Sequence, residues 1–147
     1  MANFNSQAIA RRLPVPGFGA GGGQVREQFS VVTIPVGGTT TDTIQLFDLP
    51  PNARVVGIRV KNAALGGAAT LNIGDAGYGS VAADPDRYFA AGSVATAAYS
   101  TTLAATGANF RTGPRKLRIT AAFAAGTTAT AGDIEVALQF VVEEPQA

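Results

Sequence analysis

The chain of 147 residues contains no cysteine, no histidine and no tryptophan. Without cysteine it can form neither a disulfide nor a thiolate metal site, and it has no thiol nucleophile. Without histidine it lacks the side chain that most often acts as a general base or binds a transition metal. These absences predict a protein that is not an enzyme and that uses no cofactor and no metal.

Charge is also scarce, because only 14% of the residues are charged, with 11 basic and 10 acidic side chains and a net charge of +1. Such a chain has no large basic field with which to hold nucleic acid, so we expect no direct nucleic-acid binding. A surface with few charges is poorly protected against association. We therefore expect part of the surface to be covered by protein neighbours, and the alternative is a neutral surface rich in alanine, threonine and glycine.

Long hydrophobic runs are missing too. No segment reaches the roughly 18 apolar residues of a membrane-spanning helix. The first residues, MANFNSQAIARRLPVPGFG, lack the apolar core of a secretory signal. We expect no contact with a membrane and synthesis in the cytoplasm.

Residues 1–25 have the composition of a flexible N-terminal arm. Pro14 and Pro16 prevent a stable helix, and residues 21–23 are three consecutive glycines. A tail that is only solvated needs no apolar side chains, yet this segment has several. It is either a disordered tail or an arm that becomes ordered on a neighbouring subunit, and its candidate contact residues are Phe4, Ile9, Arg11, Arg12, Leu13 and Phe18.

From residue 26 onward the apolar residues follow a period of two, which indicates strands. The clearest case is residues 133–142, where Ile134, Val136, Leu138, Phe140 and Val142 should face the core. The same pattern places Val56, Ile58 and Val60 inward, and Ile44, Leu46 and Asp48 on one face. Strands are expected within residues 28–34, 39–49, 54–61, 69–73, 87–90, 116–123 and 133–142, with a loop or weak strand over 91–107.

These segments predict an all-β domain over residues 26–147, preceded by the extended N-terminal arm. About seven or eight strands, separated by frequent turn signals, fit a jelly-roll-like β-sandwich. An immunoglobulin-like sandwich is the alternative.

Two groups of charged residues are candidate sites. Asp75, Asp84 and Asp86 could bind Ca²⁺, although Asp-Gly and Asp-Pro pairs are also ordinary turn residues. The string of residues 84–89 is more typical of a loop anchor, with an aspartate pairing with an arginine and two aromatic rings packing on the sheet. The second group could meet an acidic patch on a partner, or it could protect a sheet edge from pairing; it comprises Arg111, Arg115, Lys116 and Arg118.

From about residue 26 to residue 142, the order of the segments and their overall residue pattern resemble those of the small structural proteins of tailed bacteriophages, particularly head decoration (cement) proteins. The segments that carry the resemblance are residues 33–39, 49–55, 71–75 with 84–89, and 132–136. The resemblance implies a β-sandwich that binds the outside of the capsid in the virion and bridges neighbouring capsid subunits. It also implies the major capsid protein as partner, a homo-oligomer with a trimer favoured, and the arm as a clamp.

Three other functions stay open. A receptor- or glycan-binding module of a fibre or tail would need exposed aromatic side chains, and Tyr78, Tyr88 and Tyr99 are the tyrosines of the chain. A small hydrolase would have to use the three aspartates named above. A capsid or tail-tube subunit would assemble with itself.

Overall fold

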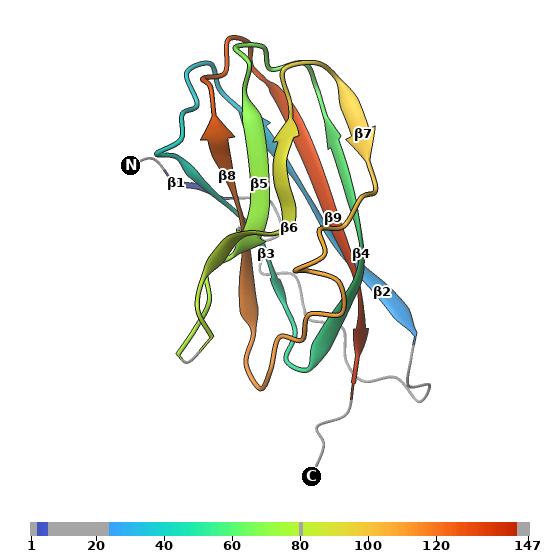
Figure 1. Cartoon of the computed structure of the whole chain (residues 1–147). Coiled ribbons are helices and arrows are strands. Elements are labelled where there is room, and N and C mark those ends of the chain that lie inside the picture. Colours follow the sequence, from blue (N-terminus) through green and yellow to red (C-terminus); the bar gives the residue numbers. More distant parts are fainter. Residues whose placement is uncertain (1–2, 6–23, 80, 144–147) are drawn as a thin grey trace.

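The computed structural model describes residues 3–5, 24–79 and 81–143. These residues contain strands and no helix (Figure 1). The strands are β1 (Asn3–Asn5), β2 (Val25–Ile34), β3 (Thr43–Leu49), β4 (Ala53–Asn62), β5 (Thr70–Asp75), β6 (Asp84–Ser93), β7 (Ala98–Ser100), β8 (Leu117–Ala125) and β9 (Gly132–Val142).

The strands form two sheets, in the orders β1-β3-β8-β5-β6 and β2-β9-β4-β7. Strand β2 pairs with β9, β3 with β8, β4 with β7 and β5 with β6, all antiparallel. These pairs form one long antiparallel ribbon, in which β2 to β5 run along one side and β6 to β9 return along the other. The ribbon is wrapped into two layers, which is the topology of a jelly roll. The prediction of an all-β, jelly-roll-like sandwich is therefore confirmed.

The core lies between the two sheets and follows the period of two. On β9 the side chains of Ile134, Val136, Leu138 and Phe140 are buried, as predicted, and Val142 packs against the core at its edge. Complete burial of each such side chain contributes about 1.5–3 kcal/mol of transfer free energy. The central strands, with apolar side chains on the inner face, thus fix the register of the sandwich.

A bulge in β3 changes which of its residues face the core. The pairing of β3 with β8 shifts between Gln45 and Phe47, so Phe47 and Leu49 both point inward and are fully buried. The prediction that Asp48 shares a face with Ile44 and Leu46 was wrong, because the extra residue turns Asp48 outward.

A second bulge lies in β4, where the pairing with β9 shifts between Val55 and Gly57. Val55 is fully buried and Val56 only half-buried, so the prediction that Val56 faces the core was wrong. Beyond the bulge Ile58 and Val60 are buried, as predicted. A Cβ at Gly57 would lie 2.4 Å from Oε1 of Gln139, so the glycine leaves room for that side chain to lie across β4.

β6 and β1 differ from the expectation, whereas β7 agrees with the loop or weak strand expected over residues 91–107. β6 runs from Asp84 to Ser93, whereas only residues 87–90 were expected to be extended. β7 supplies three residues of strand within 91–107. In the predicted arm, β1 pairs in parallel with β3, in the register Phe4 with Ile44. The division into an arm of residues 1–25 and a domain of residues 26–147 stays a prediction, with β2 beginning at Val25.

Candidate interaction surfaces

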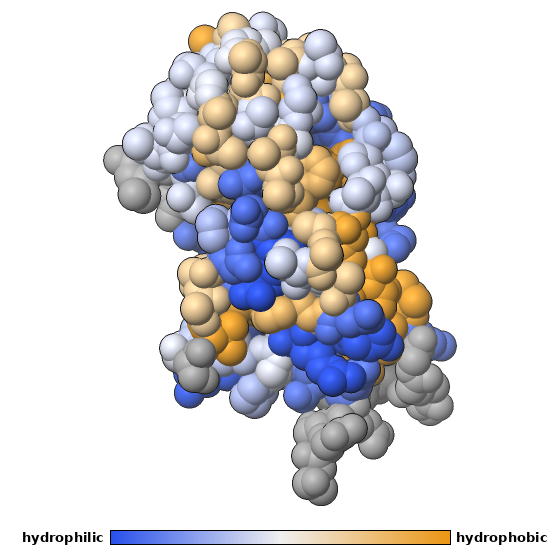
Figure 2. All heavy atoms as spheres, viewed as in Figure 1, coloured by the Kyte–Doolittle hydropathy of each residue, from blue (hydrophilic) through white to orange (hydrophobic). Residues whose placement is uncertain are grey.

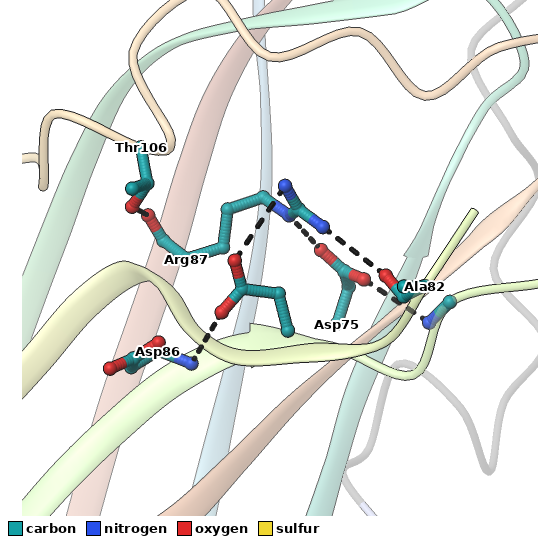
Figure 3. Close-up of polar contacts among 7 residues, drawn as sticks. Asp75, Ala82, Asp86, Arg87 and Thr106 are labelled. Atoms are coloured by element: carbon teal, nitrogen blue, oxygen red, sulfur yellow. Dashed lines mark hydrogen bonds and ion pairs between the residues drawn. The ribbon is translucent and has the colours of Figure 1, made fainter.

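The predicted aspartate cluster is organised around Arg87 on β6 (Figure 3). The Arg87 Nε donates to Oδ2 of Asp75 at 2.6 Å, and its Nη1 lies 3.7 Å from Oδ2 of Asp84. The Asp75 side chain is completely buried and the Arg87 side chain is 14% exposed. The second Asp75 oxygen accepts a bond from the N–H of Gly77 at 3.1 Å. The charge of the buried Asp75 carboxylate is therefore balanced by Arg87, and both of its oxygens accept hydrogen bonds.

Asp86 lies on the exposed side of the same cluster. Its N–H donates to Oδ1 of Asp84 at 3.3 Å. The side-chain hydrogen bond with Asp84, followed by partial desolvation and the charge of Asp84, raises the pKa of Asp86. Within residues 3–5, 24–79 and 81–143, no three acidic side chains come together in a group that could hold a metal ion. The contacts of Asp75, Asp84 and Asp86 thus favour turn formation and ion pairing over the calcium site.

Aromatic rings also pack around Arg87 and its neighbour Tyr88. The Arg87 guanidinium lies over the ring of Phe110, 3.9 Å from its centroid, and Tyr88 meets Phe110 edge to face at 6.2 Å. Thr106 Oγ1 donates to the carbonyl oxygen of Arg87 at 2.7 Å (Figure 3). Burial raises the pKa of the fully buried Tyr88 phenol. The residues 84–89 therefore lie in strand β6 and attach the loop after β7 to the sheet, whereas the sequence predicted that they anchor their own loop.

The predicted basic cluster is divided among three places. Arg118 on β8 pairs with Asp48 of β3, and its Nη1 donates to Oε1 of Gln45 at 2.8 Å. Arg111 Nε pairs with Glu143 at 2.9 Å. Arg115 lies over the ring of Tyr78, 5.9 Å from its centroid, and Lys116 is exposed nearby in sequence. The four residues do not form one basic surface, because neighbouring side chains use the charge of at least two of them.

Glu143 joins two arginines at the end of β9. Its Oε1 accepts from Nε of Arg54 at 2.7 Å and its Oε2 accepts from Nε of Arg111 at 2.9 Å. These bonds, led by the one from Arg54, lower the pKa of Glu143. On the side of the molecule that Figure 2 shows, many residues are pale and the most hydrophilic ones form compact clusters.

The arm residues proposed as contacts are only partly covered by the structure. Phe4 lies in β1, beside Ile44 of β3. The other five lie outside the described residues: Ile9, Arg11, Arg12, Leu13 and Phe18. Their role as partner contacts stays a prediction.

One surface was missed from the sequence, the outer face of the sheet β2-β9-β4-β7. Phe29 on β2 is 60% exposed and Tyr99 on β7 is 61% exposed. Between them Ala137 of β9 forms the floor of a hollow of about 330 Å³, which Arg59 of β4 also lines. This hollow is called the Phe29–Tyr99 hollow below. A sequence signal existed, since the period of two that buries Ser30, Val32 and Ile34 must turn Phe29 outward.

Across the described ranges, the structure contains no helix long and apolar enough to cross a membrane. No family model and no curated protein matches the chain.

Two solved structures contain similar chains. A chain of the cyanophage Pam1 capsid asymmetric unit is 29% identical, with a TM-score of 0.68, over 90% of this chain and 94% of that one. A chain of the capsid of Ralstonia phage GP4 is 20% identical, with a TM-score of 0.77, over 98% of this chain and all of that one. The second likeness concerns the fold alone. The similarity to the Pam1 capsid chain supports a structural protein of a phage virion.

Proposed function

We propose that this chain is a structural, non-enzymatic virion protein that binds the outer surface of a phage capsid and stabilises it by bridging capsid subunits. The observation that carries the proposal is the similarity to a chain of the Pam1 capsid, which extends over nearly the full length of both chains at 29% identity. The partner is the major capsid protein, and the protein acts as a homo-oligomer, with a trimer favoured.

The jelly-roll body suits this role because its polar groups are largely used within it. The buried pair of Arg87 with Asp75 and the bridge from Arg54 to Glu143 fix loops and strand ends to the sheets. A body held in this way presents its faces without reorganising, which lowers the entropic cost of binding. Binding across the joint of two capsid subunits then adds its free energy to the stability of the shell by mass action.

The arm supplies a second means of attachment. Residues 3–5 already pair with the edge of a sheet, in parallel with β3. Pairing of this kind uses backbone hydrogen bonds, which any sheet edge with free groups can provide. An arm that becomes ordered on binding loses entropy but reaches farther than the body. The arm of residues 1–25 is therefore the proposed clamp.

The alternative function is a self-assembling capsid or tail-tube subunit. It is favoured by the fact that both similar chains belong to capsid structures. An isolated shell or tube subunit would polymerise. A decoration protein would remain a discrete small oligomer.

The experiment is co-sedimentation of the purified full-length chain with capsids of its phage that lack it. We expect the full-length chain to pellet with the capsids, and a variant without residues 1–23 to bind at least tenfold more weakly while keeping its circular dichroism spectrum. A Val36→Ser variant is the matched control for a change on the exposed body. Failure of the full-length chain to pellet, or its polymerisation without capsids, would contradict the proposal.

A further inference from the structure

The outer face of the sheet β2-β9-β4-β7 is divided into an acidic half and a basic half. The outward side chains of β2 and β9 include Glu27, Asp133 and Glu135, and none of them is basic. The outward charged side chains of β4 are basic, and Arg59 and Lys61 are the exposed ones. The face as a whole is close to neutral, yet each half carries one sign.

Not all of these charges are used within the chain. Arg59 pairs with Glu27 across the sheet. Lys61 and Glu135 are register partners on adjacent strands, but no ion pair within 4.0 Å joins these two described side chains to each other or to a neighbour. Both are exposed. One base and one acid of this face are therefore free to pair with a partner.

The hydrophobic residues of the face lie at its two flanks. Phe29 stands on β2 at one edge of the sheet and Tyr99 on β7 at the other, with the Phe29–Tyr99 hollow between them. Val25, 62% exposed, extends the first flank along β2. Three of the four large hydrophobic side chains that are exposed in the described residues thus belong to this face; the fourth is Val36. In Figure 2 hydrophobic residues reach the surface on the side where Figure 1 draws β4 and β2.

We propose that a second copy of this chain docks on this face, with the acidic half of one copy against the basic half of the other. A copy turned about an axis parallel to the strands has its halves exchanged, so its β2 and β9 lie over β4 and β7. Glu135 then approaches Lys61 of the second copy, and Phe29 approaches Tyr99. A partner of uniform charge would match only one half of the face.

This inference specifies the surface behind the homo-oligomer in the proposed function, and it rests on that proposal in this respect alone. The copy turned in this way occupies both halves of the face, so the contact closes after two copies. A trimer would need a different contact, in which each acidic half meets the basic half of a separate neighbour. The measured mass tells them apart.

The test is light scattering after size exclusion, on the full-length chain and three variants at one protein concentration. We expect the unchanged chain to have twice its mass of 14.9 kDa, and three times that mass would overturn the two-fold contact. Glu135→Lys should shift it to the mass of one chain, because two bases then face each other across the contact. The exchange Lys61→Glu with Glu135→Lys should restore the oligomer. The control Asp86→Lys makes the same charge change on β6 of the other sheet and should leave the mass unchanged.

Thermal unfolding of each variant shows whether it is folded. A second pair of variants, Phe29→Ser with Val36→Ser as control, tests the hydrophobic flank without a change of charge, and only the first should lower the mass. A single-chain mass for the unchanged protein, or an unchanged mass for both Glu135→Lys and Phe29→Ser, would overturn the inference. Capsid co-sedimentation separates the two proposals: an oligomer that dissociates as expected but never pellets refutes the capsid binding alone, whereas a monomer that pellets refutes this inference and the homo-oligomer but leaves the capsid binding intact.

Discussion

The buried ion pair between Arg87 and Asp75 gives the sharpest prediction about stability. Replacing Arg87 with methionine keeps most of the apolar contact with the Phe110 ring but removes the ion pairs with Asp75 and Asp84. The carboxylate of Asp75, fully buried, then keeps the bond from the N–H of Gly77 but has no cation beside it among the described residues. Breaking a buried pair in this way costs about 3–5 kcal/mol.

We expect Arg87→Met to lower the free energy of unfolding by about 3 kcal/mol, the lower end of that range, because the Gly77 bond persists. For a domain of this size the loss corresponds to roughly 10 °C in Tm. Urea denaturation at fixed protein concentration measures it. The matched control is Arg111→Met, whose side chain is 66% exposed in its pair with Glu143 and which should cost less than about 1 kcal/mol.

A double-mutant cycle identifies the cause. If the cost comes from an unpaired buried charge, adding Asp75→Asn to Arg87→Met should recover at least about 1 kcal/mol, because the asparagine side chain is neutral. A loss for Arg87→Met no larger than that of Arg111→Met would refute the reasoning. So would a double variant less stable than Arg87→Met alone.

Three further predictions concern single positions. Tyr88→Phe should be as stable as the unchanged protein or about 1 kcal/mol more stable, since the buried hydroxyl has no hydrogen-bond partner among the residues that the structure describes; a loss of that size in urea denaturation would contradict this. Gly67→Ala should cost about 4 kcal/mol of unfolding free energy, because its Cβ would lie 1.7 Å from the carbonyl oxygen of Thr127 at a φ of +63°. Gly37→Ala, at a φ of +89° but with open space around the Cβ, should cost only about 1 kcal/mol. Equal losses in the two variants would refute the steric argument. Because its pKa is lowered, Glu143 contributes stability at pH values above its ordinary pKa of 4.5, and this contribution is lost as the pH falls through the folded-state pKa. Glu143→Gln should therefore flatten the decline of Tm below about pH 4.5, and parallel pH profiles of the two proteins would argue against this.

The fold could be predicted from the sequence wherever the alternation of apolar residues is uninterrupted. The strand ending at Val142 is the clearest example, because five apolar residues at every second position leave one register. The two bulges could not be predicted in the same way. An inserted residue keeps the composition of the strand and only exchanges its faces, as at Asp48 and at Val55 with Val56.

The candidate sites were less predictable, because their contacts join distant parts of the chain. Arg118 finds its partner Asp48 70 residues away, so a cluster of basic residues in the sequence is not a basic surface in the fold. The Phe29–Tyr99 hollow joins β2 to β7 through two strands that lie between them. The period of two implies that Phe29 faces outward, whereas the presence of Tyr99 in the same hollow depends on the strand order.

The order of the strands also has a consequence for the synthesis of the chain. β8 lies between β3 and β5, and β9 lies between β2 and β4, so the last two strands to be made are internal strands of the two sheets. Until residue 142 has left the ribosome, β2 lacks the strand with which it pairs. A chain released early would expose unpaired edges on both layers, and such edges promote aggregation. The body of this protein is therefore expected to fold in one step once β9 has been made, and products that end before β9 are expected to be removed rather than assembled.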